Sequence, residues 1–223
     1  MKTTPPVSQR ILYEDNHLIA VNKLPSEIVQ GDKTGDMPLS EIVKSYIKKK
    51  YDKPGEVYLG VIHRLDRPVS GVTVFARTSK ALARMNELVK NRRMKKTYWA
   101  IVKNLPPEPE GTLIHYLLRN PRKNKSFVSR KASSGSKEAI LRYRLIAESE
   151  TYYLLEIDLE TGRHHQIRAQ LSAMGCPIRG DLKYGFDRSN PDASISLHAR
   201  SIDFIHPVKK EKVRITADPP EDS

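Results

Sequence analysis

The 223-residue sequence contains one cysteine, Cys176, and no long run of apolar residues. A single cysteine forms no internal disulfide and builds no thiolate metal cluster, which fits a reducing compartment. No stretch approaches the roughly 20 apolar residues of a membrane span, and the first ten residues lack the apolar region of a secretory signal. We therefore expect a cytoplasmic protein that does not associate with membranes.

Several patterns that would indicate a cofactor or a common catalytic site are also missing. The sequence has neither a glycine-rich phosphate loop nor the GxSxG motif of serine hydrolases. Its histidines show no HxxxH spacing and have neither a thiolate nor a suitably placed acid beside them. The histidines considered are His63, His164, His165, His198 and His206. We expect no nucleotide cofactor and no metal.

Positive charge is the property that the sequence has in excess. Thirty-nine lysines and arginines against 26 acidic residues give a net charge of +13. A polyanion relieves the self-repulsion of such a surplus, so nucleic acid is the first partner class to consider; a basic protein that is merely soluble is the alternative. Residues 119–131 carry six bases and no acid around Phe127 and Val128. This segment is either an exposed β-ribbon able to follow a phosphate backbone or a solvated loop.

The hydrophobic pattern predicts an α+β fold in one globular unit, residues 1–223. Helical spacing marks residues 39–50, a helix capped by Ser79, and a helix opened by residues 161–171 and closed by Gly175. Short alternating or β-rich runs predict a largely antiparallel sheet. The strands expected are 11–13, 18–21, 97–102, 139–147, 152–159, 196–205 and 212–216. Residues 104–111, with three prolines, are the best candidate for the meeting point of two halves.

One acidic residue stands among arginines in the stretch from His63 to Gly71. Asp66 lies beside Arg64 and Arg67, and an apolar strand follows it. A guanidinium favours the ionised carboxylate, so such an aspartate is either a salt-bridge residue or a nucleophile or base. Tyr98 and Arg168 are the other candidates for chemistry. From the residues alone, both interpretations remain open.

Three ordered motifs resemble those of the RluA family of pseudouridine synthases. The stretch HRLDRPVSG at 63–71 resembles the catalytic motif of this family, KKTYWAIV at 95–102 its tyrosine motif, and TGRHHQIR at 161–168 its arginine motif. The resemblance extends from about Ile11, through Asn22-Lys23 and residues 180–185, to His206-Pro207. It therefore covers nearly the full length.

The resemblance implies a single catalytic domain with a bent antiparallel sheet and a central catalytic cleft. It implies that Asp66 is the catalytic aspartate, that Tyr98 packs on the target base, and that Arg168 pairs with Asp66. Arg64 would hold the RNA in place of the extruded nucleotide. The remaining substrate-binding residues that it implies are His63, Arg67, Ile167, Arg163 and His165. No cofactor or metal is implied.

The partner that the resemblance implies is ribosomal or transfer RNA, with no obligate protein partner. We expect a monomer. We expect no separate N-terminal RNA-binding domain, because about ten residues precede the first hairpin. The family pattern Lys-Pro-x-Gly is replaced by Lys23-Leu24-Pro25-Ser26, which predicts a different first loop. Two other classes remain: a non-catalytic RNA-binding or ribosome-assembly protein on the same fold, and a metal-dependent nuclease.

Overall fold

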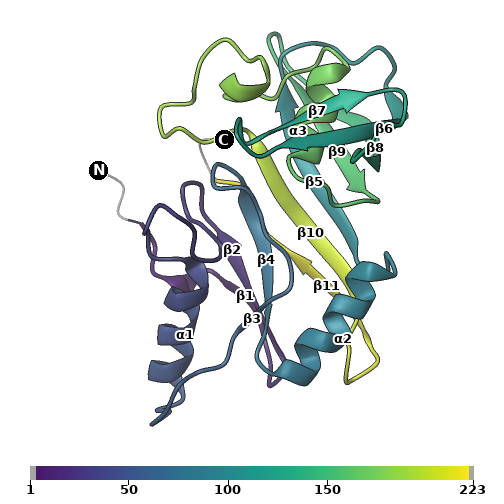
Figure 1. The fold of residues 1–223 in the computed structure, drawn as a ribbon. Helices are drawn as coiled ribbons and strands as arrows, with labels where there is room; N and C mark the ends of the chain where they lie inside the picture. Colours follow the sequence, from purple (N-terminus) through teal and green to yellow (C-terminus); the bar gives the residue numbers. More distant parts are fainter. Residues whose placement is uncertain (1–3, 221–223) are drawn as a thin grey trace. The chain divides into compact units, whose positions relative to one another are not determined.

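The computed structural model describes residues 4–220, and within them the chain forms two compact units (Figure 1). Unit 1 contains residues 4–94 and 200–220, and unit 2 contains residues 95–199. Within the described residues, no helix is long and apolar enough to cross a membrane.

Unit 1 is a set of antiparallel strands with two helices. Its strands pair in the order β1-β2-β4-β10, with β3 on β4 and β11 on β10. The elements are η1 (Val7–Gln9), β1 (Ile11–Glu14), β2 (Leu18–Lys23), α1 (Leu39–Lys50), β3 (Gly60–Val61), β4 (Ser70–Ala76), α2 (Ser79–Lys90), β10 (Leu197–Ile205) and β11 (Lys212–Thr216). The first residues of β10 belong to unit 2.

The central strands of unit 1 are buried on both faces, which explains why their sequence is apolar rather than alternating. All seven residues of β4 are buried. One face contributes Leu18, Ala20 and Val74 to a core that also contains Ala81 and Met85 of α2. The other face carries buried residues as well, including Ile19 and Phe75. Burial on both faces holds β4 and the loop before it in place.

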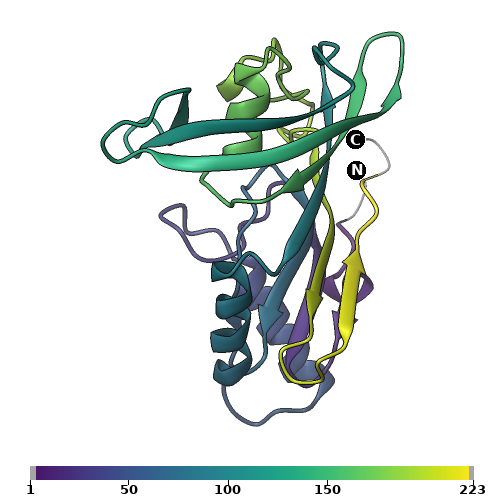
Figure 2. The same cartoon turned by 90° about the vertical axis from the view of Figure 1, so that its right-hand side faces the viewer.

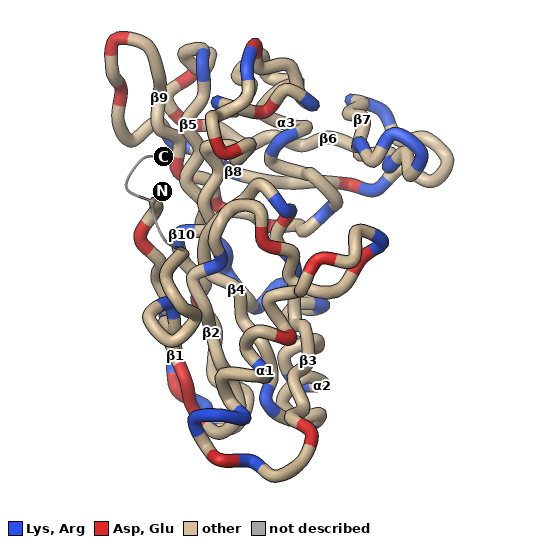
Figure 3. Tube along the Cα trace, turned by 90° about the vertical axis from the view of Figure 1, so that its left-hand side faces the viewer, with Lys and Arg blue, Asp and Glu red and all other residues tan. Residues whose placement is uncertain are grey.

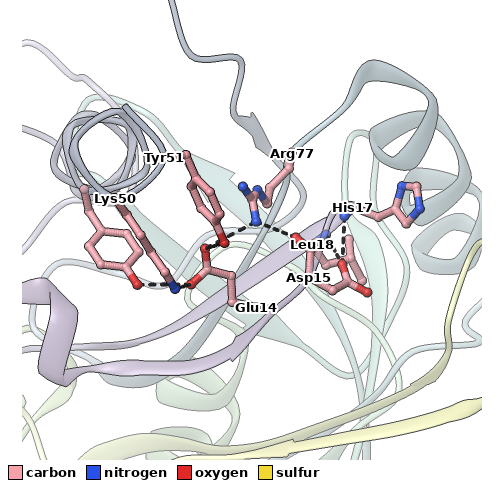
Figure 4. A network of polar contacts seen from close by, with 8 residues as sticks. Glu14, Asp15, His17, Leu18, Lys50, Tyr51 and Arg77 are labelled. Carbon is pink, nitrogen blue, oxygen red and sulfur yellow. Dashed lines mark hydrogen bonds and ion pairs between the residues drawn. The ribbon is translucent and has the colours of Figure 1, made fainter. Parts of the chain in front are cut away.

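Glu14 fastens α1 to the first hairpin of unit 1 (Figure 4). Its carboxylate accepts from Tyr46 Oη at 3.0 Å, Lys50 Nζ at 2.6 Å, Tyr51 Oη at 2.8 Å and Arg77 Nη1 at 3.3 Å. Burial alone would raise the pKa of Glu14, but hydrogen bonds from Lys50, Tyr51 and Tyr46 outweigh it and lower this pKa. The cluster is therefore a structural fastening.

Unit 2 is built on five antiparallel strands in the order β5-β9-β8-β6-β7. Figure 2 shows the teal and green strands of β6 and β8 running side by side over a long distance. Strands β6, β7 and β8 form a hydrophobic cluster with α3 and η2, made of Leu117, Val128, Ala139, Ala169 and Tyr184. The elements are β5 (Lys95–Val102), β6 (Glu110–Asn120), β7 (Lys125–Ser129), β8 (Lys137–Glu148), β9 (Tyr153–Leu159), α3 (Gln166–Ala173) and η2 (Leu182–Tyr184).

The α+β class and the antiparallel pairing are confirmed, and the segment 119–131 is a β-ribbon around the β6–β7 turn. The cap of α2 is Thr78, whose hydroxyl accepts from Ala81 N at 3.1 Å, and not Ser79. The third helix begins at Gln166, since His165 has a left-handed backbone (φ 53°) that interrupts the helix predicted from Thr161. Gly175 follows its end with φ 89°.

The proline-rich segment 104–111 does not separate the two units. It lies inside unit 2 and joins β5 to β6, while the chain passes between units after residues 94 and 199. Prolines mark a place where the chain leaves a strand. A boundary between units depends on where long-range contacts become few, and proline content does not report on that.

Candidate functional site

Residues 62–69 connect β3 to β4 in unit 1, and residues 65–69 of this connection form the Asp66 loop. Val69 N donates to Asp66 O at 3.0 Å and closes a turn. Leu65 and Val69 are buried, whereas Asp66 is half-buried and Arg64 is exposed. The apolar residues at the two ends anchor the loop, and the charged residues between them keep access to solvent.

Lys23 binds the backbone of this loop through hydrogen bonds. Its side chain is fully buried, and Nζ donates to the carbonyl oxygens of Leu24 at 3.0 Å, Arg67 at 3.1 Å and Val69 at 2.6 Å. Burial lowers the pKa of Lys23 to about 7, against the opposing charges of Glu27 and Asp66. Three carbonyl acceptors match the three protons of an ammonium group. Lys23 therefore fixes the shape of the chain directly after Asp66.

Arg67 and His63 also have partners inside unit 1. Arg67 donates to Asp36 Oδ2 at 2.7 Å and to Thr34 Oγ1 at 2.9 Å, and its carbonyl accepts from Ser26 N at 2.9 Å. His63 Nε2 accepts from Val74 N at 3.1 Å. Arg67 thus connects the first loop, residues 24–38 between β2 and α1, to the Asp66 loop. The RNA contacts of Arg67 and His63 stay predictions.

The arginine motif in unit 2 forms a turn before α3. Gln166 Oε1 accepts from Thr161 Oγ1 at 2.8 Å and from Arg163 N at 3.0 Å, which closes the turn. Ile167 and Arg168 follow in the first turn of α3, and each is 5% exposed. Arg163 is half-buried and its Nε donates to Glu138 O at 2.8 Å.

Arg168 is held by a carboxylate and by an aromatic ring. Its Nε and Nη2 donate to the two oxygens of Asp181, at 2.7 and 2.8 Å, and Asp181 is 1% exposed. The guanidinium carbon lies 5.1 Å from the ring centroid of Tyr184, a cation–π geometry. A bidentate pair of this kind fixes both the position and the orientation of a guanidinium.

Tyr98 lies in β5 opposite Ile157 of β9 and is 7% exposed. His165 is also buried, and its Nδ1 lies 3.0 Å from Tyr184 Oη. Within residues 4–220, no group of three or more histidine, cysteine, aspartate or glutamate side chains is arranged to hold a metal ion.

Basic side chains concentrate on the β6–β7 ribbon, and Figure 3 shows blue segments gathered around its turn. Arg119, Arg122 and Lys123 are exposed, and so is the ring of Phe127 at 44%. Lys125 Nζ lies 5.9 Å from the centroid of that ring. Cations beside an exposed aromatic ring suit both the phosphates and the bases of RNA.

The predicted site residues thus form two groups. His63, Arg64, Asp66 and Arg67 lie together in unit 1, and Arg163, His165, Ile167 and Arg168 lie together in unit 2 with Tyr98 elsewhere in that unit. The pairing of Asp66 with Arg168 stays a prediction. The prediction of site residues omitted Lys23, Asp181 and Tyr184, although all three lie in segments covered by the family resemblance.

Comparison with known proteins gives a consistent answer. Residues 17–173 match the family model described as RNA pseudouridylate synthase. The chain belongs to the RNA pseudouridylate synthase family. The resemblance found in the three motifs is therefore confirmed.

Two relatives from this pseudouridylate synthase family show how far the similarity extends. Ribosomal large subunit pseudouridine synthase D of Xylella fastidiosa is 34% identical over 95% of this chain, which spans 66% of the relative. The uncharacterised RNA pseudouridine synthase YjbO of Bacillus subtilis is 30% identical over 97% of this chain and 75% of its own length.

A solved structure described as human RNA pseudouridylate synthase domain containing 4 superimposes with a TM-score of 0.81. It covers 97% of this chain and 90% of the human chain at 23% identity, and so supports the fold.

Proposed function

We propose that this protein isomerises uridine to pseudouridine in RNA, and that its substrate is ribosomal RNA of the large subunit. The observation that carries the proposal is family membership together with an aspartate at the position of the catalytic motif, Asp66. The name of the Xylella relative supports the substrate class. We propose in addition that the protein acts as a monomer in the cytoplasm.

The reaction needs no redox step and no transfer of a group to a second molecule. The bond between N1 of uracil and C1′ of the ribose breaks, the base turns, and a bond forms between C5 and C1′. The proton on C5 is released and N1 gains one, so the overall change is an isomerisation. A carboxylate in a site shielded from water can carry this chemistry as nucleophile or base.

Within this proposal Asp66 attacks or deprotonates the substrate, Tyr98 packs on the target base, and Arg168 holds the carboxylate of Asp66. Two features support these roles. Lys23 fixes the backbone around Asp66, and Asp181 fixes the guanidinium of Arg168. The backbone after Asp66 and the guanidinium of Arg168 are each fixed within their own unit, as positioned reacting groups require.

A uridine inside an RNA helix has to leave its base stack before it reaches the half-buried carboxylate of Asp66. Flipping costs a few kcal/mol, and contacts between cations and phosphates can offset this cost. We propose that the cations of the β6–β7 ribbon supply such contacts, and that Arg64, which is exposed, occupies the space left by the flipped nucleotide. His63, Arg67, Ile167, Arg163 and His165 complete the proposed substrate site.

The test uses large-subunit rRNA transcribed in vitro with tritium at C5 of uridine, because formation of the C5–C1′ bond releases this tritium to water. Wild type is expected to release tritium, and mapped pseudouridines identify the target. Asp66→Asn is expected to release none while keeping most of its affinity for the RNA. Asp187→Asn, a change at an exposed aspartate that pairs with Lys103, is the matched control and is expected to behave as wild type.

Transfer RNA labelled in the same way is the second substrate in the assay. Release only from transfer RNA would overturn the ribosomal assignment. Binding of both RNAs without release would favour the non-catalytic RNA-binding protein. Cleavage of the RNA that depends on added metal would favour the nuclease.

A further inference from the structure

The hydroxyl of Tyr184 lies at the junction of three parts of unit 2. It accepts from the backbone N–H of Ser126 in β7 at 2.8 Å, and it lies 3.0 Å from Nδ1 of His165, the residue before α3. Tyr184 itself ends η2 and is 4% exposed. One buried hydroxyl therefore joins the ribbon, the start of α3 and η2.

The ring of Tyr184 serves a different pair of groups from its hydroxyl. The guanidinium carbon of Arg168 lies 5.1 Å from the ring centroid, and Lys125 Nζ lies 4.9 Å from it. Asp181, which binds Arg168 with both oxygens, stands three residues before Tyr184 at the start of η2. The short η2 segment thus presents a carboxylate and an aromatic face to the same guanidinium.

A second set of contacts, in addition to those of the Tyr184 hydroxyl, connects the β6–β7 ribbon to the start of α3. Ser126 Oγ donates to His164 O at 2.7 Å and lies 2.9 Å from Nδ1 of His164. The rings of His164 and His165 stack with centroids 3.7 Å apart. His164 Nε2 lies 3.2 Å from Oδ1 of Asn124 in the β6–β7 turn. The turn of the ribbon and the first residues of β7 are therefore both tied to the start of α3.

From this geometry we propose that Tyr184 is a positioning residue that couples the RNA-binding ribbon β6–β7 to the orientation of Arg168. This inference rests on the proposed function. RNA held on the ribbon acts on α3 through the hydroxyl of Tyr184, while the ring of Tyr184 and Asp181 keep the guanidinium aligned. The hydroxyl contributes to RNA binding, and the ring contributes to the chemical step.

The two roles predict a split between two substitutions. Tyr184→Phe keeps the ring beside Arg168 and removes the hydrogen bond to Ser126 N. It is expected to raise KM for the RNA about fivefold, as for the loss of one ordinary hydrogen bond, with kcat within about twofold of wild type. Tyr184→Leu also removes the ring and is expected to lower kcat by about tenfold or more.

Tyr143→Phe is the matched control, because Tyr143 is a buried tyrosine of β8 in the same unit. It is expected to leave KM and kcat unchanged. A purely structural role of Tyr184 predicts another pattern, in which Tyr184→Phe reduces the active fraction, so that kcat falls and KM stays constant. That pattern, or an unchanged KM in Tyr184→Phe, would overturn the proposal.

Two measurements that need no turnover separate this proposal from the proposed function. In Tyr184→Phe the amide of Ser126 is expected to exchange its hydrogen faster than in wild type, and the Kd for the rRNA transcript is expected to rise by the same factor as KM. Wild type that binds this RNA without releasing tritium would defeat the proposed function alone. Unchanged exchange and Kd in Tyr184→Phe would defeat the coupling alone.

Discussion

Two buried cations hold the two halves of the proposed chemistry, and they are compensated differently. Lys23 in unit 1 directs Nζ at three backbone carbonyls around Asp66. Arg168 in unit 2 is bound by the carboxylate of Asp181 and faces the ring of Tyr184. The ammonium group of the lysine donates all three of its hydrogen bonds to the main chain and so fixes the shape of a loop. The guanidinium of the arginine is bound by side chains that fix its orientation, as a group that acts on a ligand requires.

The largest effect is expected from Arg168→Ala. Removing one member of a buried ion pair leaves Asp181 uncompensated and typically costs about 3 to 5 kcal/mol. Loss of the proposed partner of Asp66 should abolish tritium release as well. Urea denaturation and the release assay measure both effects. Arg163→Ala in the same motif is the control for stability, since Arg163 is half-buried and binds one backbone carbonyl; an equal loss of stability there would contradict the special role of Arg168.

Lys23→Met is expected to have the next largest effect. The carbonyls of Arg67 and Val69 lose a buried donor, and the expected loss is about 2 to 3 kcal/mol in the free energy of unfolding. Activity should fall because the loop around Asp66 loosens. Lys96→Met is the matched control, because burial alone lowers the pKa of Lys96. The control variant is expected to be at least as stable as wild type. A loss of stability equal to that of Lys23→Met would show that the hydrogen bonds from Lys23 to the three carbonyls do not stabilise the fold.

The pH dependence should differ between the two cations. The pKa of Lys23 falls from 10.5 in the unfolded chain to about 7 in the fold, so between these values the unfolded chain binds more protons. The stability difference between wild type and Lys23→Met should therefore grow with rising pH from 7 to 9, by at most about 1.4 kcal/mol per pH unit. Arginine stays charged, so the difference for Arg168→Ala should be flat. Urea denaturation of wild type and both variants at pH 7, 8 and 9 checks these expectations. If the stability difference between wild type and Lys23→Met does not change with pH, the carbonyls keep the ammonium group charged.

Glu14→Gln is expected to have the smallest effect on stability. It serves as the comparison variant, because Glu14 is a charged residue with a purely structural role. Gln keeps one of the two acceptor oxygens that Tyr46 and Tyr51 use, and it loses the ion pairs with Lys50 and Arg77. We expect a loss of about 1 to 2 kcal/mol in the free energy of unfolding. The kcat for tritium release should equal that of wild type. A fall in kcat without a change in stability would mean that the α1 fastening also affects the site.

The sequence by itself determined the family and most of the elements, but it did not predict β6 (Glu110–Asn120). The helix at 39–50 and the strands at 139–147 and 152–159 follow from periodicities of 3.6 and 2, which are local properties of the chain. The three motifs are also short stretches of consecutive residues, and they identified Asp66, Tyr98 and Arg168 as candidate catalytic residues. The cap at Thr78 and the left-handed His165 were missed because they depend on single backbone angles that a hydrophobic pattern does not encode.

Only the tertiary structure decided which partners the buried charges have. Lys23 reaches Val69 across 46 positions, and Tyr184 reaches Ser126 across 58. Several acids are available to Arg168 in the sequence, and packing of η2 selects Asp181 as a bound partner. A buried charge has to be compensated within a few ångströms, and the groups within that distance are known only once the strands and helices have packed.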